Sequence, residues 1–183
     1  GGLCGLTHED DPRIPEGKDG AQHYAILQIG VHVTDHNLNI LDEGLDLIIH
    51  HAPEDLEKRV GEWSQKQFAN TLMKSCASAL NPSLDEAELR VIDYLKEFGI
   101  EKGSSPLCGN SIYLDRRFME CQMRKLNAFM HYRQLDVSSI GEMISRMYPM
   151  TFDRRPAKAS RHDALTDIRE SIEELRFYRN ECM

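Results

Sequence analysis

Apolar residues follow two different spacings near the start of this chain of 183 residues. Residues 24–33 form a nearly continuous apolar run, and residues 38–49 alternate in part between apolar and polar side chains. Residues 34–37 (Thr-Asp-His-Asn) separate the two runs and favour a turn. Because two such runs joined by a short polar segment are typical of a hairpin, we predict two adjacent antiparallel strands.

Helical spacing of apolar residues begins at residue 53 and is expected to continue to residue 80, where Asn81-Pro82 ends it. A second helix follows Ser83. Ser83 and Glu86 have the spacing of a capping box, in which each side chain satisfies a backbone N–H group at the helix start. Gly99 provides the stop signal. Both ends of this second helix are therefore predicted by the sequence.

The second half of the chain alternates short strands with helices. Strands are predicted at residues 106–112 and 132–137, and helices at 116–130, at 139–148 behind a capping box of Ser139 and Glu142, and from Leu165 to Tyr178. Residues 1–23 lack an apolar period and are rich in Gly, Pro, Asp and His, so we expect an irregular N-terminal arm. Residues 24–183 are long enough for one α/β domain with a sizeable core.

The composition limits the class of partner. Hydrophobic residues make up 40% and charged residues 28% of the chain, which is typical of a globular protein. The formal net charge is -8. Proteins that hold long nucleic acids by their phosphates usually carry a basic face, so an acidic protein that binds nucleic acid should grip few phosphates.

The compartment is also predicted from what the sequence lacks. No apolar stretch approaches the roughly 20 residues of a membrane helix, and no signal segment opens the chain. The five cysteines are scattered without a C-x-x-C pair, which argues against a disulfide framework and a structural zinc site. We expect an intracellular, cytoplasmic protein without membrane contact, with the mitochondrion as the alternative compartment for a eukaryotic source.

His162 and Asp167 stand five positions apart at the entrance to the last predicted helix. Five helical steps of about 100° would place them about 140° apart, so they converge only if His162 lies on the turn before the helix. Histidine suits a general base and clustered carboxylates suit divalent metals, which are the two needs of phosphodiester hydrolysis. The alternative is structural, with Asp163 and Asp167 favouring the helix N-terminus and His162 on the surface.

Two other segments contain candidate chemistry. Asp115 follows a predicted buried strand, where it could share a metal with another element or act as a helix N-cap. The segment from His131 to Ser138 contains Arg133 and hydroxyls that could bind one terminal phosphate, while the alternative is a strand with a surface ion pair.

Taken together, these segments resemble the oligoribonuclease family, because they match its signatures in the family's order. Similarity extends from about residue 26 to the C-terminus. The matching segments are Cys108-Gly109-Asn110-Ser111-x-x-x-Asp115-Arg116-Arg117-Phe118, His131-Tyr132-Arg133-x-Leu135-Asp136-Val137-Ser138 and His162-x4-Asp167-Ile168-Arg169-Glu170-Ser171, with further matches at Val33-Thr34-Asp35-x-x-Leu38-Asn39-Ile40-Leu41-x-Glu43-Gly44 and Phe177-Tyr178-Arg179.

The resemblance implies a fold, an activity and an assembly. The fold would be RNase H-like, a mixed sheet flanked by helices in a single domain, as in the DEDDh exonuclease group. The protein would be a homodimer that degrades short RNA oligonucleotides, of two to about five residues, in the 3′-to-5′ direction. Hard oxygen ligands imply Mg²⁺ or Mn²⁺ as the cofactor.

The same resemblance assigns roles to particular residues. Asp115 and Asp167 would bind metal, and His162 would be the general base. Residues implied in substrate binding are Ser111, Arg133 and Ser138 as a cap on the 5′ phosphate, Tyr132 with its neighbours near the dimer interface and the partner's active site, and Leu6 as a wedge between bases.

The start of the chain departs from the family pattern. The family's first strand reads approximately Trp-x-Asp-x-Glu-Met-Thr-Gly-Leu, and its Asp and Glu complete the metal site. If residues 4–6 (Cys-Gly-Leu) correspond to its Thr-Gly-Leu, Gly2 occupies the Glu position and the Asp would precede Gly1. Gln28 also stands where the family usually has Glu. We therefore expect residues 1–183 to hydrolyse RNA poorly.

Two alternatives to a short-RNA exonuclease belong to different classes. One is a catalytically impaired relative that binds short nucleotides or acts only as a dimeric structural protein. The other is a nuclease of the same group that acts on longer DNA, and the acidic net charge argues against it.

Overall fold

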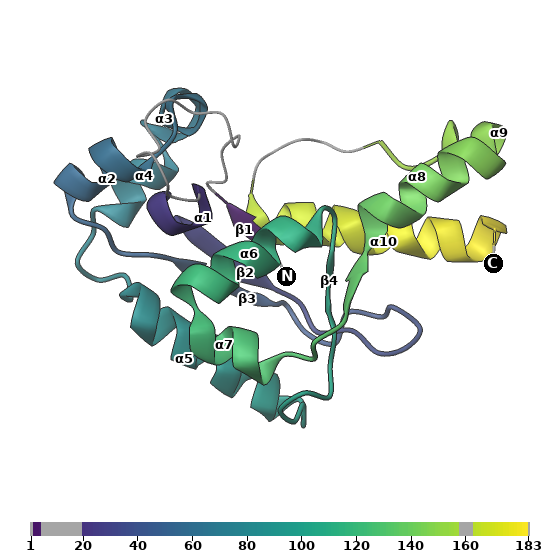
Figure 1. The fold of residues 1–183 in the computed structure, drawn as a ribbon, viewed down its shortest axis with the longest axis horizontal. Coiled ribbons are helices and arrows are strands. Elements are labelled where there is room, and N and C mark those ends of the chain that lie inside the picture. Colours follow the sequence, from purple (N-terminus) through teal and green to yellow (C-terminus); the bar gives the residue numbers. More distant parts are fainter. Residues whose placement is uncertain (1, 5–19, 158–162, 183) are drawn as a thin grey trace.

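The computed structural model describes residues 2–4, 20–157 and 163–182 (Figure 1). Its strands are β1 (Gly2–Cys4), β2 (Gln28–Val31), β3 (Leu45–Ile48), β4 (Leu107–Gly109) and β5 (Gln134–Asp136). Its helices are α1 (Gly20–His23), α2 (Pro53–Arg59), α3 (Glu62–Phe68), α4 (Leu72–Cys76), α5 (Leu84–Glu97), α6 (Ile112–Gln122), α7 (Arg124–Phe129), α8 (Val137–Met147), α9 (Pro149–Phe152) and α10 (Ala164–Cys182). The fold is therefore mixed α/β.

The described strands form two separate sheets. One is antiparallel, in the order β1-β2-β3, with Gly2 opposite Gly30 and Gln28 opposite Ile48. The other pairs β4 with β5 in parallel, which places Gly109 opposite Asp136. The parallel register brings the C-terminal ends of β4 and β5 side by side.

Successive residues of β2 face different helices, as the two-residue period of a strand requires. Ile29 belongs to the main hydrophobic cluster, which also contains Val91 of α5 and Phe118 of α6. Gly30 faces α10, where an added Cβ would lie 3.0 Å from Ala164. The absence of a side chain at this position lets α10 approach the strand closely.

Two smaller clusters support the ends of the molecule. One lies under α2 and α4, and the other joins Val137 and Ile144 of α8 to Tyr178 of α10. Figure 1 shows α2, α3 and α4 gathered at one end and α8, α9 and the C-terminal part of α10 at the other. The second end supports the site described below.

A cavity of about 360 Å³ is lined by residues of both sheets. Most of its lining side chains are apolar, including Val31 and Val33 from the β2 segment and Leu107 from β4. Asp115 of α6 also lines it. The separation of the two sheets thus coincides with an apolar cavity beside one of the candidate metal-binding carboxylates.

Several predictions from the sequence are confirmed. β2 and β3 form the predicted antiparallel pair, and α5 has the predicted capping box of Ser83 and Glu86. Gly99 follows α5 with a φ of 72°, a left-handed conformation that favours glycine. No described helix is long and apolar enough to cross a membrane.

The single helix predicted for residues 53–80 is wrong, because this stretch forms α2, α3 and α4. Leu56, Val60 and Cys76 all belong to the second hydrophobic cluster. In one continuous helix, Cys76 would lie about 200° around the axis from Leu56, on the opposite face. Breaking the helix lets all three side chains reach the same cluster.

The prediction of an irregular arm at residues 1–23 is wrong at both ends of that range, where the structure has a strand and a helix. Gly2–Cys4 pairs with β2 through backbone hydrogen bonds, and Gly20–His23 forms α1. Backbone pairing of so short a strand leaves no apolar period in the sequence. Residues 5–19 lie outside the described residues.

Two predicted helix starts are also wrong. α8 begins at Val137 rather than at residue 139, because Asp136 acts as its N-cap and accepts the Ser138 backbone N–H. α6 begins at Ile112, so Asp115 lies in its first turn and is not an N-cap. At α6, the N-cap position is held by Ser111, which makes no side-chain cap hydrogen bond.

Candidate active site

Ser111 and Ser138 lie together where β4 and β5 end. The Ser111 backbone N–H donates to Asp136 Oδ1 and to Ser138 Oγ, each at 3.0 Å. The two serine hydroxyls are 3.3 Å apart. Because Gly109 and Asp136 are opposite each other in the parallel pair, the residues that follow them meet at one edge of this small sheet. The structure therefore brings together two of the three predicted cap residues.

The backbone of Ser111 is left-handed, with φ 48° and ψ 37°. This conformation is uncommon for a residue other than glycine and is concentrated at functional sites. Here it directs the Ser111 N–H group away from α6 and toward the start of α8. The sequence contains no glycine at this position that would have predicted the turn.

Arg133 and Tyr132 lie before β5 and are exposed. The Tyr132 ring stacks on His131 at a centroid distance of 4.4 Å, and the Arg133 guanidinium lies 5.2 Å from the Tyr132 ring centroid. β5 separates Arg133 from Ser138 by about 10 Å of strand. Within one chain, the structure does not bring Arg133 to the serine pair.

Asp115 and Asp167 lie on two helices that contact the same strands. Asp115, in α6, is 6% exposed, and Asp167, in the first turn of α10, is half-buried. Both α6 and α10 contact β1 and β4. The helices that carry the two predicted metal-binding carboxylates therefore both pack against one strand of each sheet.

Asp163 caps α10. Its Oδ2 accepts the Thr166 hydroxyl at 2.7 Å and the Thr166 backbone N–H at 3.0 Å. Burial alone would raise the pKa of Asp163, but the hydrogen bonds from Thr166 hold the pKa below its usual value. For Asp163, the structural alternative is thus correct, because this residue stabilises the N-terminus of α10.

Gln28 joins the start of α10 to the sheet, a role that the sequence reasoning missed. It is 5% exposed and donates through Nε2 to Asp46 Oδ1 at 2.8 Å and to Asp163 Oδ1 at 3.4 Å. The Ala164 backbone N–H donates to Gln28 Oε1 at 3.4 Å. A polar residue inside an apolar strand, followed closely by Gly30, was the available signal.

His162 and Leu6 lie outside the described residues. Their roles as general base and as wedge between bases therefore remain predictions. α10 begins at Ala164, two positions after His162 in the sequence. Placing the histidine before the helix was the condition for its convergence with Asp167.

The candidate carboxylates meet part of the needs of a metal site. Asp115 and Asp167 supply the hard oxygen atoms that Mg²⁺ and Mn²⁺ prefer. Among the described residues, however, no group of three or more His, Cys, Asp or Glu side chains could hold a metal ion. The described donors fit part of a metal site, and Gly2, in β1 opposite Gly30, adds no carboxylate to it.

Comparison with known proteins defines the class to which this arrangement belongs. The sequence model of the exonuclease (RNase T) family matches residues 15–175, which include β2 to β5 and most of α10. The mixed α/β fold is consistent with the RNase H-like fold predicted from the sequence.

Relatives in three bacteria identify the family within this class of exonucleases. The oligoribonuclease of Streptomyces griseus is 41% identical over 155 residues, covering 85% of this chain and 76% of the relative. The oligoribonuclease of Dichelobacter nodosus is 44% identical over 159 residues, covering 86% and 85%. That of Aeromonas hydrophila is 41% identical over 164 residues, covering 90% and 88%. The chain belongs to the oligoribonuclease family of exonucleases.

Proposed function

We propose that this protein is a 3′-to-5′ exoribonuclease that degrades RNA of two to about five nucleotides to mononucleotides by metal-dependent hydrolysis. The observation that supports this most is the serine pair at the ends of β4 and β5, held by Asp136 beside the helix α10. A fixed polar pair at one end of a site suits a substrate whose end is close to the scissile bond. The relatives' name, oligoribonuclease, agrees with such a substrate.

In this proposal, Asp115 and Asp167 hold Mg²⁺ or Mn²⁺ together with further oxygen ligands. A divalent metal pair stabilises the charge on the attacking and leaving oxygens of a phosphodiester. Asp115 is suited to a metal because a buried carboxylate next to an apolar cavity gains from a cationic neighbour. His162 removes the proton from the attacking water as the general base.

The substrate's 5′ phosphate would be bound by Ser111, Ser138 and Arg133. Because Arg133 and Tyr132 lie beyond β5 from the serine pair, they complete the cap in our proposal by reaching the site of a second chain in a homodimer. Leu6 would stack between the bases. The net charge of -8 agrees with a cap that grips one phosphate and disfavours long RNA.

We further infer that residues 24–183 act as one exonuclease domain. For the compartment, we propose the cytoplasm, or the mitochondrion if the source is eukaryotic.

Parallel incubation with a 5′-labelled dinucleotide and a long RNA tests the proposed function. Two proteins would be used: residues 1–183, and a version in which Gly2→Glu is combined with an Asp added before Gly1. We expect the second protein to cleave the dinucleotide faster than the long RNA and only with Mg²⁺ or Mn²⁺. Equal cleavage of both RNAs, or cleavage in a chelator, would reject this function.

A further inference from the structure

A chain of hydrogen bonds connects the buried side of α10 with the serine pair. Glu174 is 6% exposed, and its Oε1 accepts the Tyr178 hydroxyl at 2.8 Å. Its Oε2 accepts Asn110 Nδ2 at 3.2 Å. Asn110 Oδ1 in turn accepts the Ser138 hydroxyl at 3.1 Å. Asn110 is therefore the link between a buried carboxylate and the proposed phosphate cap.

The surroundings of Asn110 specify which way its amide points. The Ser171 hydroxyl donates to the Asp167 carbonyl at 2.9 Å, so its oxygen accepts from Asn110 Nδ2, also at 2.9 Å. Glu174 offers a second acceptor on the same side. Because both neighbours on the α10 side accept, the amide nitrogen must face them and the amide oxygen must face Ser138.

This orientation determines the roles of the two serine hydroxyls. The hydrogen of the Ser138 hydroxyl is engaged by Asn110, so Ser138 Oγ is left to accept from the Ser111 backbone N–H. The Ser111 hydroxyl can then donate, either to Ser138 Oγ at 3.3 Å or to an incoming phosphate oxygen. Space beside this network is available, since Asn110, Ser138 and Glu174 also line a cavity of about 510 Å³.

We propose that Asn110 is a positioning residue that directs the serine pair and thereby gives the cap its preference for a terminal phosphate. This inference rests on the proposed function. Asn110 acts through Ser138 and Ser111 and does not touch the reacting atoms. Ser171 and Glu174 determine the orientation of the Asn110 amide, so the position of the serine pair depends on the position of α10.

Binding of two dinucleotides, pApA and ApA, tests this role in a chelator that prevents turnover. The quantity measured is the ratio of their dissociation constants. Asn110→Ala should reduce the preference of residues 1–183 for pApA about tenfold, the effect of one lost charge-assisted hydrogen bond. Thermal unfolding of each variant shows whether the fold is retained.

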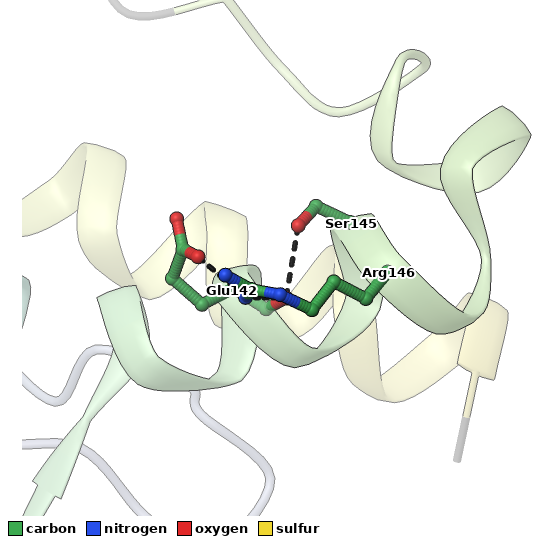
Figure 2. A network of polar contacts seen from close by, with 3 residues as sticks. All are labelled: Glu142, Ser145 and Arg146. Carbon is green, nitrogen blue, oxygen red and sulfur yellow. Dashed lines mark hydrogen bonds and ion pairs between the residues drawn. The ribbon is translucent and has the colours of Figure 1, made fainter.

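Ser145→Ala provides a matched control on the same helix as Ser138. Figure 2 shows the polar network of Ser145, Glu142 and Arg146 on α8. The Ser145 hydroxyl donates to the Glu142 carbonyl at 2.8 Å, and Arg146 pairs with the Glu142 carboxylate at 2.5 Å. Removing the Ser145 hydroxyl should leave the preference for pApA unchanged.

A complementary pair of substitutions separates positioning from loss of packing. Asn110→Asp removes the donor and places a carboxylate against Glu174, so the preference for pApA should fall. Adding Glu174→Gln supplies an amide that can donate to the new carboxylate, and the preference should return in part. An unchanged preference in Asn110→Ala, or no recovery in the double variant, would overturn the proposal. If residues 1–183 bound neither dinucleotide, the proposed function itself would fail.

Discussion

The two halves of the candidate site differ in how completely the described residues build them. At the cap, Ser111, Ser138 and Asn110 each have several hydrogen-bond partners, and these partners come from β5, α8, α10 and the turn that follows β4. At the carboxylate half, Asp115 lines an apolar cavity between two sheets, and no group of three ligands is found among the described residues.

From this difference we infer that substrate binding and catalysis depend on different parts of the chain. The cap is held by hydrogen bonds that join the residues after β4 with Asp136, Ser138 and α10, and by packing between α8 and α10. The proposed metal site needs further oxygen donors, and Gly2 in β1 offers none. We therefore expect residues 1–183 to bind short RNA but to hydrolyse it slowly.

The largest expected effect concerns the carboxylates of the first strand. Residues 1–183 should hydrolyse a dinucleotide very slowly, because a two-metal site needs several carboxylates to supply ligands and to balance charge. The version with Gly2→Glu and an added Asp before Gly1 should be faster by several orders of magnitude. Initial rates at saturating Mg²⁺ measure the difference. Similar rates for both proteins would mean that other residues supply the missing ligands.

The next effect separates the general base from the metal ligands. In the version with the completed first strand, His162→Ala should reduce kcat by about 10²- to 10⁴-fold, the usual effect of losing a positioned base. Its unfolding temperature should stay close to that of the parent. Unchanged turnover would remove His162 from the mechanism and favour its alternative assignment as a surface residue.

Arg133 tests whether the cap is completed from beyond β5. Arg133→Ala should weaken binding of a 5′-phosphorylated dinucleotide by about 1.5–3 kcal/mol, because a charge-assisted hydrogen bond is lost. Binding of the unphosphorylated dinucleotide should change little. Titration of both ligands in a chelator gives the two free energies, and equal losses would show that Arg133 does not contact the phosphate.

The smallest effect concerns Asp163, which caps α10 at the carboxylate half. Asp163→Ala should lower the free energy of unfolding by about 1 kcal/mol, as expected for a lost N-cap. Because the folded-state pKa of Asp163 is lowered, its contribution is present above the unfolded pKa of about 3.9 and is lost as the pH falls toward the folded value. Chemical denaturation at pH 7 and at pH 3 measures this difference, which should shrink at the lower pH.

How far the sequence predicted these two halves depends on the kind of contact. Local signals found the helix α5, the hairpin of β2 and β3, and the serine pair through its family segments. The left-handed turn at Ser111 was missed because the partners of its N–H group, Asp136 and Ser138, lie 25 and 27 positions along the chain. The link through Asn110 was missed because it depends on residues of α10 that lie more than 60 positions along the chain. The break of residues 53–80 into three helices was missed for a similar reason, since the cluster that Cys76 joins also contains Leu27.

This protein is an exonuclease for short RNA, and we propose that its cap and metal site are separable. A competition tests this proposal, in which the version with the completed first strand acts on a labelled dinucleotide in the presence of long RNA and Mg²⁺. We predict rapid conversion of the dinucleotide to mononucleotides, with the long RNA a weak competitor, and residues 1–183 binding the dinucleotide with similar affinity. Strong competition by long RNA, or dinucleotide affinity that appears only with the added carboxylates, would contradict this account.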